Sequence, residues 1–269
     1  MMTTAPVRVP GIVRTMGFAT DATDATAEAV QAALEQHAST ERAAGSARFF
    51  KTGPGQYGEG DRFIGVSVPA TRAVVARFPV LPPLEVGKLL ASPVHEHRLA
   101  ALLVMVRQFQ VASRPRTRDD EARATLHAAY LDAVRAGRVN NWDLVDASAE
   151  YLVGEFLREA GGGDDPLLDG LAASASLWER RVAVLATFAF IKAGDGGPIL
   201  RLAPTLLADH EDLMHKAVGW MLRELGKRVD RVALLGFLDE YASRMPRTML
   251  SYATEHLSAD ERAAYRARR

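Results

Sequence analysis

One kind of amphipathic segment recurs through the second half of the chain, and this recurrence limits the possible folds more than any other feature. LWERRVAVLATFAFIK begins at Leu177, LMHKAVGWMLRELGK at Leu213 and MPRTMLSYATEHL at Met245. Their starts are separated by roughly three dozen residues, the length of one helix-turn-helix repeat. EHRLAALLVMVRQF from Glu96 and NWDLVDASAEYLVGEFL from Asn141 follow the same pattern less regularly. The repetition predicts helical pairs stacked into a solenoid with a concave face.

Short clusters of glycine and proline separate these segments. They are Gly53-Pro54-Gly55, Pro82-Pro83, Gly161-Gly162-Gly163 and Gly196-Gly197-Pro198. No strand pattern strong enough to propose a sheet lies between them. We therefore predict an all-α protein, a curved α-solenoid that forms a single domain over residues 25–269. Residues 1–24 show no clear apolar period and are predicted to be an N-terminal tail or arm.

Composition narrows the chemistry that the chain can perform. It has 33 basic and 33 acidic side chains, and this balance neither favours nor excludes a polyanionic partner. It has no cysteine, which excludes disulfides, zinc–thiolate sites and cysteine nucleophiles. His95 and His97 are two residues apart and would lie on different faces of a helix, so we expect no metal and no cofactor. No signal peptide or membrane-spanning run is visible, and we expect a cytoplasmic protein.

The segment from Leu213 carries two separate stripes of side chains. Its apolar stripe, at i, i+3, i+4 and i+7, consists of Val218, Met221, Leu222 and Leu225. A second stripe, at i, i+4, i+7 and i+11, consists of Lys216, Trp220, Arg223 and Lys227. Three cations around one tryptophan are typical of a surface that binds phosphates and offers an aromatic contact. The alternative is a solvated helix face with the tryptophan half buried against the next repeat.

The segment from Asn141 combines an aromatic ring with a carboxylate. Trp142 and Asp146 are one helical turn apart, so both can border one cleft. They lie at the edge of an apolar stripe formed by Val145, Ala149, Leu152 and Phe156. In the alternative interpretation, Asp143 or Asn141 caps the helix, and Asp146 is a surface charge or the partner of a neighbouring arginine.

The segment from Leu177 offers two arginines next to the third tryptophan of the chain. Trp178 lies three residues before Arg181, beside an apolar side formed by Val182, Leu185, Ala186 and Ala189. Arg180 and Arg181 could bind phosphates or pair with nearby acidic residues such as Glu179. They could also hold Asp146 in place across the junction between repeats. The residues alone leave these alternatives open.

Five motifs, taken in their order and spacing, resemble the AlkD-like DNA alkylation repair family, whose members are HEAT-like repeat alkylpurine DNA glycosylases. They are FFKTGPGQYGEGDRFIGVSVP, NNWDLVD, WERR, KAVGWMLRE and MPRTMLSYATEHL, and the similarity runs from about Phe49 to about Leu257. The resemblance implies a lesion site made of Trp142, Asp146, Arg181 and Trp220. Well-known members carry an aromatic residue where this chain has Asn141. The candidate DNA-binding residues around the site are Lys216, Arg223, Lys227, Arg180 and Trp178.

The resemblance also implies an activity and an unusual mode of action. The expected enzyme excises N7- or N3-alkylated purines from double-stranded DNA, which it holds along the concave face while the base stays stacked. These bases already carry a positive charge, so no general acid is needed. A carboxylate about 4 Å from the developing sugar cation contributes roughly 4 kcal/mol at an effective dielectric near 20, which is on the order of a thousandfold in rate. Asp146 is the residue predicted to supply it.

Two further expectations concern the product and the partner. No suitable lysine occurs on these motifs for a Schiff-base lyase, so we expect a monofunctional enzyme that leaves an abasic site. We also expect it to act as a monomer. The competing hypothesis is a helical-repeat module that binds branched or distorted DNA without excising bases, or a protein-binding scaffold. The pairing of Trp142 with Asp146 favours the enzyme.

Overall fold

The computed structural model describes residues 25–268. The predicted tail or arm over residues 1–24 lies outside the described residues. Within residues 25–268 every element is helical, and the one pairing of extended backbone is an isolated bridge between Arg62 and Val94. The prediction of an all-α solenoid is therefore confirmed.

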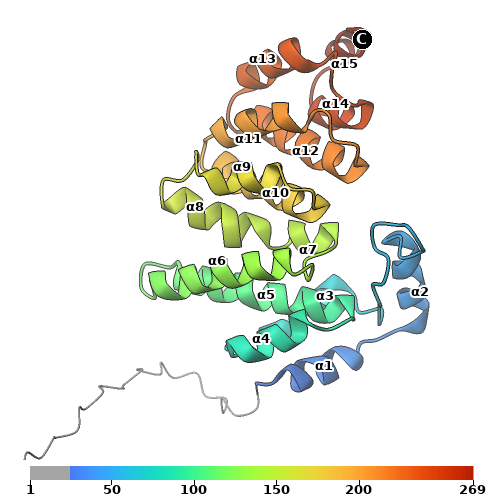
Figure 1. Ribbon diagram of the computed structural model, residues 1–269, viewed down its shortest axis with the longest axis vertical. Coiled ribbons are helices and arrows are strands. Elements are labelled where there is room, and N and C mark those ends of the chain that lie inside the picture. The colour runs from blue at the N-terminus through green and yellow to red at the C-terminus, as the bar shows by residue number, and fades with distance from the viewer. Residues whose placement is uncertain (1–24, 269) are drawn as a thin grey trace, which may run out of the picture.

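The helices stack in two rows from α1 at one end to α15 at the other (Figure 1). One row, here called the inner row, consists of α3 (Val68–Ala76), α5 (His95–Ala112), α7 (Trp142–Asp146), α10 (Leu177–Lys192), α12 (Asp212–Arg228) and α14 (Arg247–Ala253). The outer row consists of α4 (Pro83–Leu90), α6 (Asp120–Arg135), α8 (Phe156–Glu159), α9 (Pro166–Ala172), α11 (Gly197–Leu202) and α13 (Arg231–Tyr241). The stack begins with α1 (Ala27–Glu35) and ends with α15 (Ala259–Ala267), and α2 (Thr40–Phe49) follows α1 in the chain.

Local sequence signals set the helix ends. The hydroxyl of Ser176 accepts a hydrogen bond from the backbone N–H of Glu179 at 3.5 Å, which caps the start of α10. Asp119 caps α6 in the same way, through the N–H of Ala122 at 2.9 Å. These caps fix where α10 and α6 begin, and with it which side chains of their first turns face the neighbouring repeat.

The apolar stripes predicted from the sequence form the core. Val218, Met221, Leu222 and Leu225 of α12 are fully buried, and so are Val182 and Ala186 of α10. The buried apolar side chains from α1 to α15 make one contiguous cluster, so burial of apolar surface holds successive repeats together.

The segment from Asn141 departs from the single regular helix that its periodicity predicts. Helix α7 ends at Asp146, a turn follows, and residues Glu150–Glu155 adopt a wider π-helix before α8 begins. The hydroxyl of Ser148 donates to the carbonyl oxygen of Leu144 at 2.6 Å. At Gly154, an added Cβ would lie 2.2 Å from the carbonyl oxygen of Ala186, so only glycine permits this approach to α10. Tight packing against α10 thus accompanies the irregular backbone that presents Asp146.

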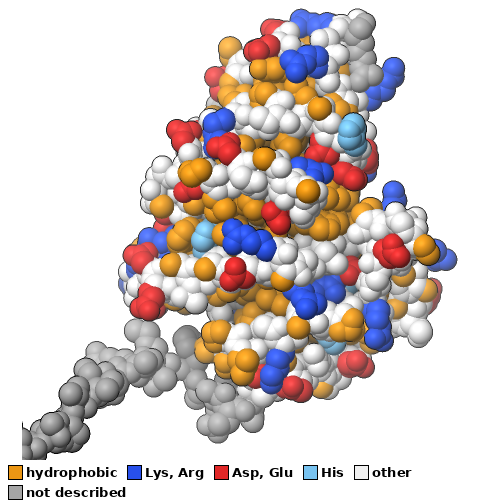
Figure 2. Space-filling view, in the orientation of Figure 1, with side chains coloured by type: hydrophobic (Ala, Val, Ile, Leu, Met, Phe, Trp, Pro, Cys, Tyr) orange, Lys and Arg blue, Asp and Glu red, His pale blue; other side chains and the backbone are white. Residues whose placement is uncertain are grey.

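Helix α2 and the loop after it stand apart from the stack, on the side where α7 and α10 begin (Figure 1). The Glu96 carboxylate at the start of α5 accepts hydrogen bonds from three consecutive backbone N–H groups, those of Ile64, Gly65 and Val66. These hydrogen bonds hold the C-terminal part of the loop between α2 and α3 against the start of α5. Basic and acidic side chains are interspersed over the face of the molecule seen in Figure 2.

Candidate active site

Asp146 and Arg181, from two successive inner helices, form an ion pair at the centre of the candidate site. The Nε of Arg181 donates to Oδ1 of Asp146 at 2.9 Å, and one Nη donates to Oδ2 at 2.8 Å. The Arg181 side chain is 5% exposed and that of Asp146 is 18% exposed. Two parallel hydrogen bonds fix the plane of the carboxylate, which a single contact would not do.

The remaining nitrogen of Arg181 ties this pair to a third repeat. It donates to the carbonyl oxygen of Leu213, just inside the start of α12, at 2.6 Å. Of the roles that the sequence left open for Arg181, the structure shows the one that holds Asp146 across the repeat junction. The alternative in which Asp146 is the partner of a neighbouring arginine is also confirmed, and the carboxylate nevertheless faces a cleft.

Opposing influences act on the pKa of Asp146. Burial raises it, the guanidinium of Arg181 lowers it through charge and hydrogen bonding, and the charge of Asp143 raises it again. The pKa lies above the ordinary value for an aspartate, because burial outweighs the ion pair. The fully charged carboxylate is consequently lost at a less acidic pH than for a surface aspartate.

A cleft of about 640 Å³ opens in front of this pair. It is lined by Phe49, Lys51, Tyr57, Trp142, Asp146, Arg181, Glu211, Asp212, Leu213, Lys216, Trp220 and Tyr252. All four residues predicted for the lesion site, Trp142, Asp146, Arg181 and Trp220, lie in it. Both tryptophans are half buried. The cleft thus brings the Asp146 carboxylate together with aromatic rings that come from α7 and α12.

The sequence-based prediction missed the part of the cleft that α2, its following loop and α14 supply. Phe49, Lys51 and Tyr57 face the cleft from the loop side, and Tyr252 faces it from α14. The Tyr57 ring also meets Trp178 edge-on at 6.2 Å. Nothing in the periodicity of residues 49–57 indicates this position, because an irregular loop carries no period. The motif FFKTGPGQYGEGDRFIGVSVP contains these residues but does not reveal which of them face the site.

The cations predicted to bind DNA fall into different environments. Lys216 lines the cleft and pairs with Asp212 at 2.8 Å. Arg223 is held by ion pairs to Glu224, at 3.0 Å, and to Glu255. Lys227 is exposed and lies outside the cleft lining. The stripe predicted on this helix therefore exists, but only its first half borders the cleft.

Arg180 serves its own helix end. It pairs with Asp209 at 2.7 Å and donates to the carbonyl oxygens of Ser174 and Ala175. Its guanidinium is thus engaged within the protein. Two other arginines, Arg72 and Arg107, line a second cavity of about 260 Å³, together with Ala147, which follows Asp146 in the chain. The sequence patterns gave no reason to single these two out.

Asn141 is the position at which the resemblance found in the sequence implies an aromatic residue. It is fully buried and caps α7 by accepting a hydrogen bond from the Trp142 N–H at 2.9 Å, as one of the alternatives had it. The aromatic ring that stacks on Trp142 is that of Phe50, at 5.3 Å between centroids.

The described residues, 25–268, contain no cluster of three or more histidine, aspartate or glutamate side chains placed to hold a metal ion. None of their helices is both long and apolar enough to cross a membrane.

The fold and the cleft together define a helical-repeat protein with a fixed carboxylate on its inner row. The chain matches the family model described as DNA alkylation repair enzyme over residues 30–257, and it belongs to that family. A predicted DNA alkylation repair enzyme from Enterococcus faecalis has a similar fold, with a TM-score of 0.63 and 15% identity. That similarity covers 83% of this chain and 98% of the other. Among curated proteins, none matches the chain.

Proposed function

We propose that this protein is a DNA glycosylase that hydrolyses the N-glycosidic bond of cationic N7- or N3-alkylated purines in duplex DNA. One observation carries the proposal: an aspartate carboxylate, fixed in plane by Arg181, faces a cleft walled by aromatic rings. A cleft with these contents suits a cation that forms beside the carboxylate. The sugar of a departing alkylpurine is such a cation.

The chemistry asks little of the protein beyond electrostatics. Both Asp146 oxygens accept hydrogen bonds from Arg181, and each keeps a lone pair that can face the sugar or orient a water molecule. The guanidinium offsets part of the carboxylate charge, so the contribution falls below the roughly 4 kcal/mol of an isolated carboxylate at 4 Å. A gain of about 2 kcal/mol still corresponds to roughly 30-fold in rate.

The aromatic walls would act on the same cation. The faces of Trp142 and Trp220 attract positive charge and keep bulk water from the sugar. The open side of the cleft supports contact with the sugar and backbone of a stacked nucleotide more than capture of an extruded base. We infer that the duplex lies along the inner row and that the base is not flipped.

Two lysines bear on whether the enzyme stops at the abasic site. Lys51 and Lys216 line the cleft, and both lie on the motifs from which we expected no lysine suited to a Schiff base. The Lys216 ammonium is paired with Asp212, and this engagement disfavours it as a nucleophile. We propose a monofunctional enzyme, and borohydride trapping on abasic DNA is the direct measurement of that point.

The experiment that tests the function uses duplex DNA with a single N7-methylguanine. Single-turnover incubation followed by heat or alkali would reveal abasic sites as strand breaks. Release of 7-methylguanine above the spontaneous rate, absent from unmodified duplex, is the expected result. Tight binding of the same duplex with no release by the wild-type protein would instead indicate a DNA-binding module without glycosylase activity.

A further inference from the structure

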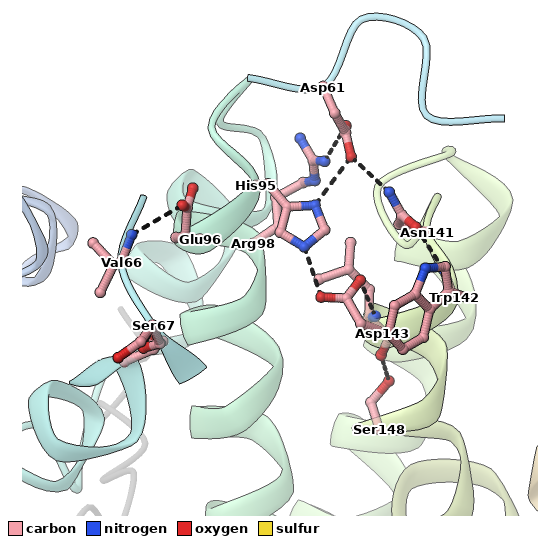
Figure 3. A network of polar contacts seen from close by, with 12 residues as sticks. Asp61, Val66, Ser67, His95, Glu96, Arg98, Asn141, Trp142, Asp143 and Ser148 are labelled. Carbon is pink, nitrogen blue, oxygen red and sulfur yellow. Dashed lines mark hydrogen bonds and ion pairs between the residues drawn. The ribbon is translucent and has the colours of Figure 1, made fainter. Parts of the chain in front are cut away.

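A group of buried charges lies at the start of α5, behind the cleft and outside its lining. The two ring nitrogens of His95 bond to different carboxylates, Nδ1 to Asp61 at 3.0 Å and Nε2 to Asp143 at 2.8 Å (Figure 3). Asp61 also pairs with Arg98 and accepts a hydrogen bond from Asn141 at 3.1 Å. The His95 and Asp61 side chains are each 2% exposed. We call these five residues the His95 cluster.

Burying so many charges is not explained by stability alone. Removing charged groups from water costs several kcal/mol each, and well-packed apolar residues often serve a core equally well. What the His95 cluster provides is a set of directional contacts between segments far apart in the sequence. Asp61 lies in the loop between α2 and α3, His95 begins α5, and Asp143 lies in the first turn of α7.

Two routes lead from His95 to Trp142, which lines the cleft. One is a stack of rings: His95 on Phe63 at 4.5 Å, Phe63 on Phe50 at 5.0 Å, and Phe50 on Trp142 at 5.3 Å between centroids. The other is polar and passes through Asn141, which donates to Asp61 and accepts from the Trp142 N–H. The cluster therefore restrains both the ring face of Trp142 and the start of its helix.

The same cluster anchors the loop that carries Lys51 and Tyr57. Asp61 holds the C-terminal end of this loop, and the N–H of Gly58 closes it by donating to the carbonyl oxygen of Lys51 at 3.1 Å. Lys51 adopts a left-handed backbone with φ of 52°, which a lysine holds only where its surroundings require it. The loop is thus a built structure that ends on the His95 cluster.

We propose that His95 is a positioning residue that joins Asp61 to Asp143 and so fixes Trp142 and Tyr57 on two walls of the cleft. His95 touches nothing in the cleft and acts only through these neighbours. The inference rests on the proposed function for its effect on catalysis. Its structural part, the joining of the loop to α7, stands independently of which reaction the cleft performs.

The proton on His95 is what makes the double contact possible. Only a protonated imidazole donates from both ring nitrogens, and each donation goes to a carboxylate. The charged groups that face the ring are Asp61 from the loop and Asp143 from α7, with Arg98 one turn along α5. Glu96 points instead to the backbone N–H groups of residues 64–66. The two carboxylates raise the pKa of His95 to about 9, against the opposing effect of burial.

The test compares His95→Gln with a matched control, His97→Gln. His97 lies on the same helix and is also buried, but its Nδ1 lies against the Ser92 hydroxyl at 2.9 Å rather than against Asp61 or Asp143. We expect His95→Gln to lower the single-turnover excision rate by roughly 10- to 100-fold, as misplacement of a site by about 1 Å does, and to weaken duplex binding only a few-fold. The control should keep the wild-type rate. Equal rates in folded samples of the two variants would overturn the proposal.

Hydrogen exchange on the wild-type protein gives a second measurement that needs neither a variant nor activity. Amides of residues 51–66 should lose protection as the pH rises through about 9, after correction for the intrinsic exchange rate, while those of α12 keep theirs. Unchanged protection in residues 51–66 would contradict the proposal even if the enzyme is active. If the wild type releases no base but this loss occurs, the proposed function fails and the positioning role stands.

Discussion

Arg181 contacts Asp146 with two nitrogens and the carbonyl oxygen of Leu213 with the third, so one guanidinium joins three successive inner helices. Arg181 fixes the Asp146 carboxylate, and the Leu213 carbonyl in turn fixes Arg181. A change at Arg181 therefore alters both the plane and the charge environment of Asp146. This relationship underlies the first two predictions.

Replacing Asp146 with Asn should separate catalysis from binding. The change keeps the size of the side chain but removes its charge, and excision should fall by roughly 10- to 1000-fold. Duplex affinity should hold or rise, because the change removes a negative charge from the cleft in which we propose that the phosphates lie. Single-turnover release of 7-methylguanine, measured beside the duplex Kd, checks this. Asp239→Asn, on α13, is the control. Full activity of Asp146→Asn would remove this residue from the mechanism.

Replacing Arg181 with Lys should change the pH dependence of the reaction. A lysine keeps one positive charge but cannot make two parallel hydrogen bonds to the carboxylate. In the wild type, activity should decline with acidification at a pH above the ordinary aspartate pKa of about 3.9, because burial raises the pKa of Asp146. Arg181→Lys should move this decline further toward neutral pH. Rate–pH profiles of both proteins decide the matter, and superimposable acid limbs would contradict the prediction.

Stability should fall at alkaline pH through His95. Its pKa is about 9 in the folded protein, above the value near 6.5 of an unfolded histidine, so the stabilisation is complete below about pH 6.5. It is lost as the pH rises through about 9, and the loss is on the order of a few kcal/mol. Urea denaturation between pH 6 and pH 10 measures it. His95→Gln should show a flatter profile, and a profile as steep as the wild type's would assign the loss to other groups.

Salt dependence should distinguish the cations that line the cleft from those that lie outside its lining. Replacing Lys51 and Lys216 with Ala should reduce the salt slope of duplex binding by roughly one to two units, at about 0.9 per phosphate contact. For Arg223 and Lys227 the stripe alone predicts the same reduction. The ion pairs of Arg223 to Glu224 and Glu255 now predict a smaller one, of about one unit or less. Filter binding at several salt concentrations compares the two double variants, and a larger effect in the second pair would place the DNA away from the cleft.

Gly58→Ala should disturb the loop while sparing the stack. A Cβ on this glycine would lie 2.2 Å from the carbonyl oxygen of Phe50, so the loop that carries Tyr57 must shift. Excision should drop by roughly 10-fold or more, with helical content preserved. Gly45→Ala on α2, where an added Cβ meets nothing within 4 Å, is the matched control and should be neutral or slightly stabilising. Circular dichroism and single-turnover rates give the readout, and equal activity of the two variants would argue against a role for the loop.

The sequence indicated those parts of the fold and site that lie on regular helices. The stripes through Val218 and Val182 gave the core, and the one-turn spacing of Trp142 and Asp146 put both on one cleft. The spacing could not reveal the turn and π-helix after Asp146, because packing of Gly154 against the Ala186 carbonyl is a tertiary contact. It also could not place Tyr57, which reaches the cleft through contacts between Asp61 and residues dozens of positions away.

The side chains that line the cleft come from separate repeats, with Trp142 on α7, Trp220 on α12 and Tyr252 on α14. The width of the cleft therefore depends on how successive helical repeats are stacked on one another. A small change in the angle between two of these repeats adds to the change at the next junction. The distance between the cleft residues therefore changes by more than either junction alone would cause. Core substitutions on α10 or α12, far from any substrate, would then change the width of the cleft. The rigidity of the stacked repeats would help to decide which substrates fit.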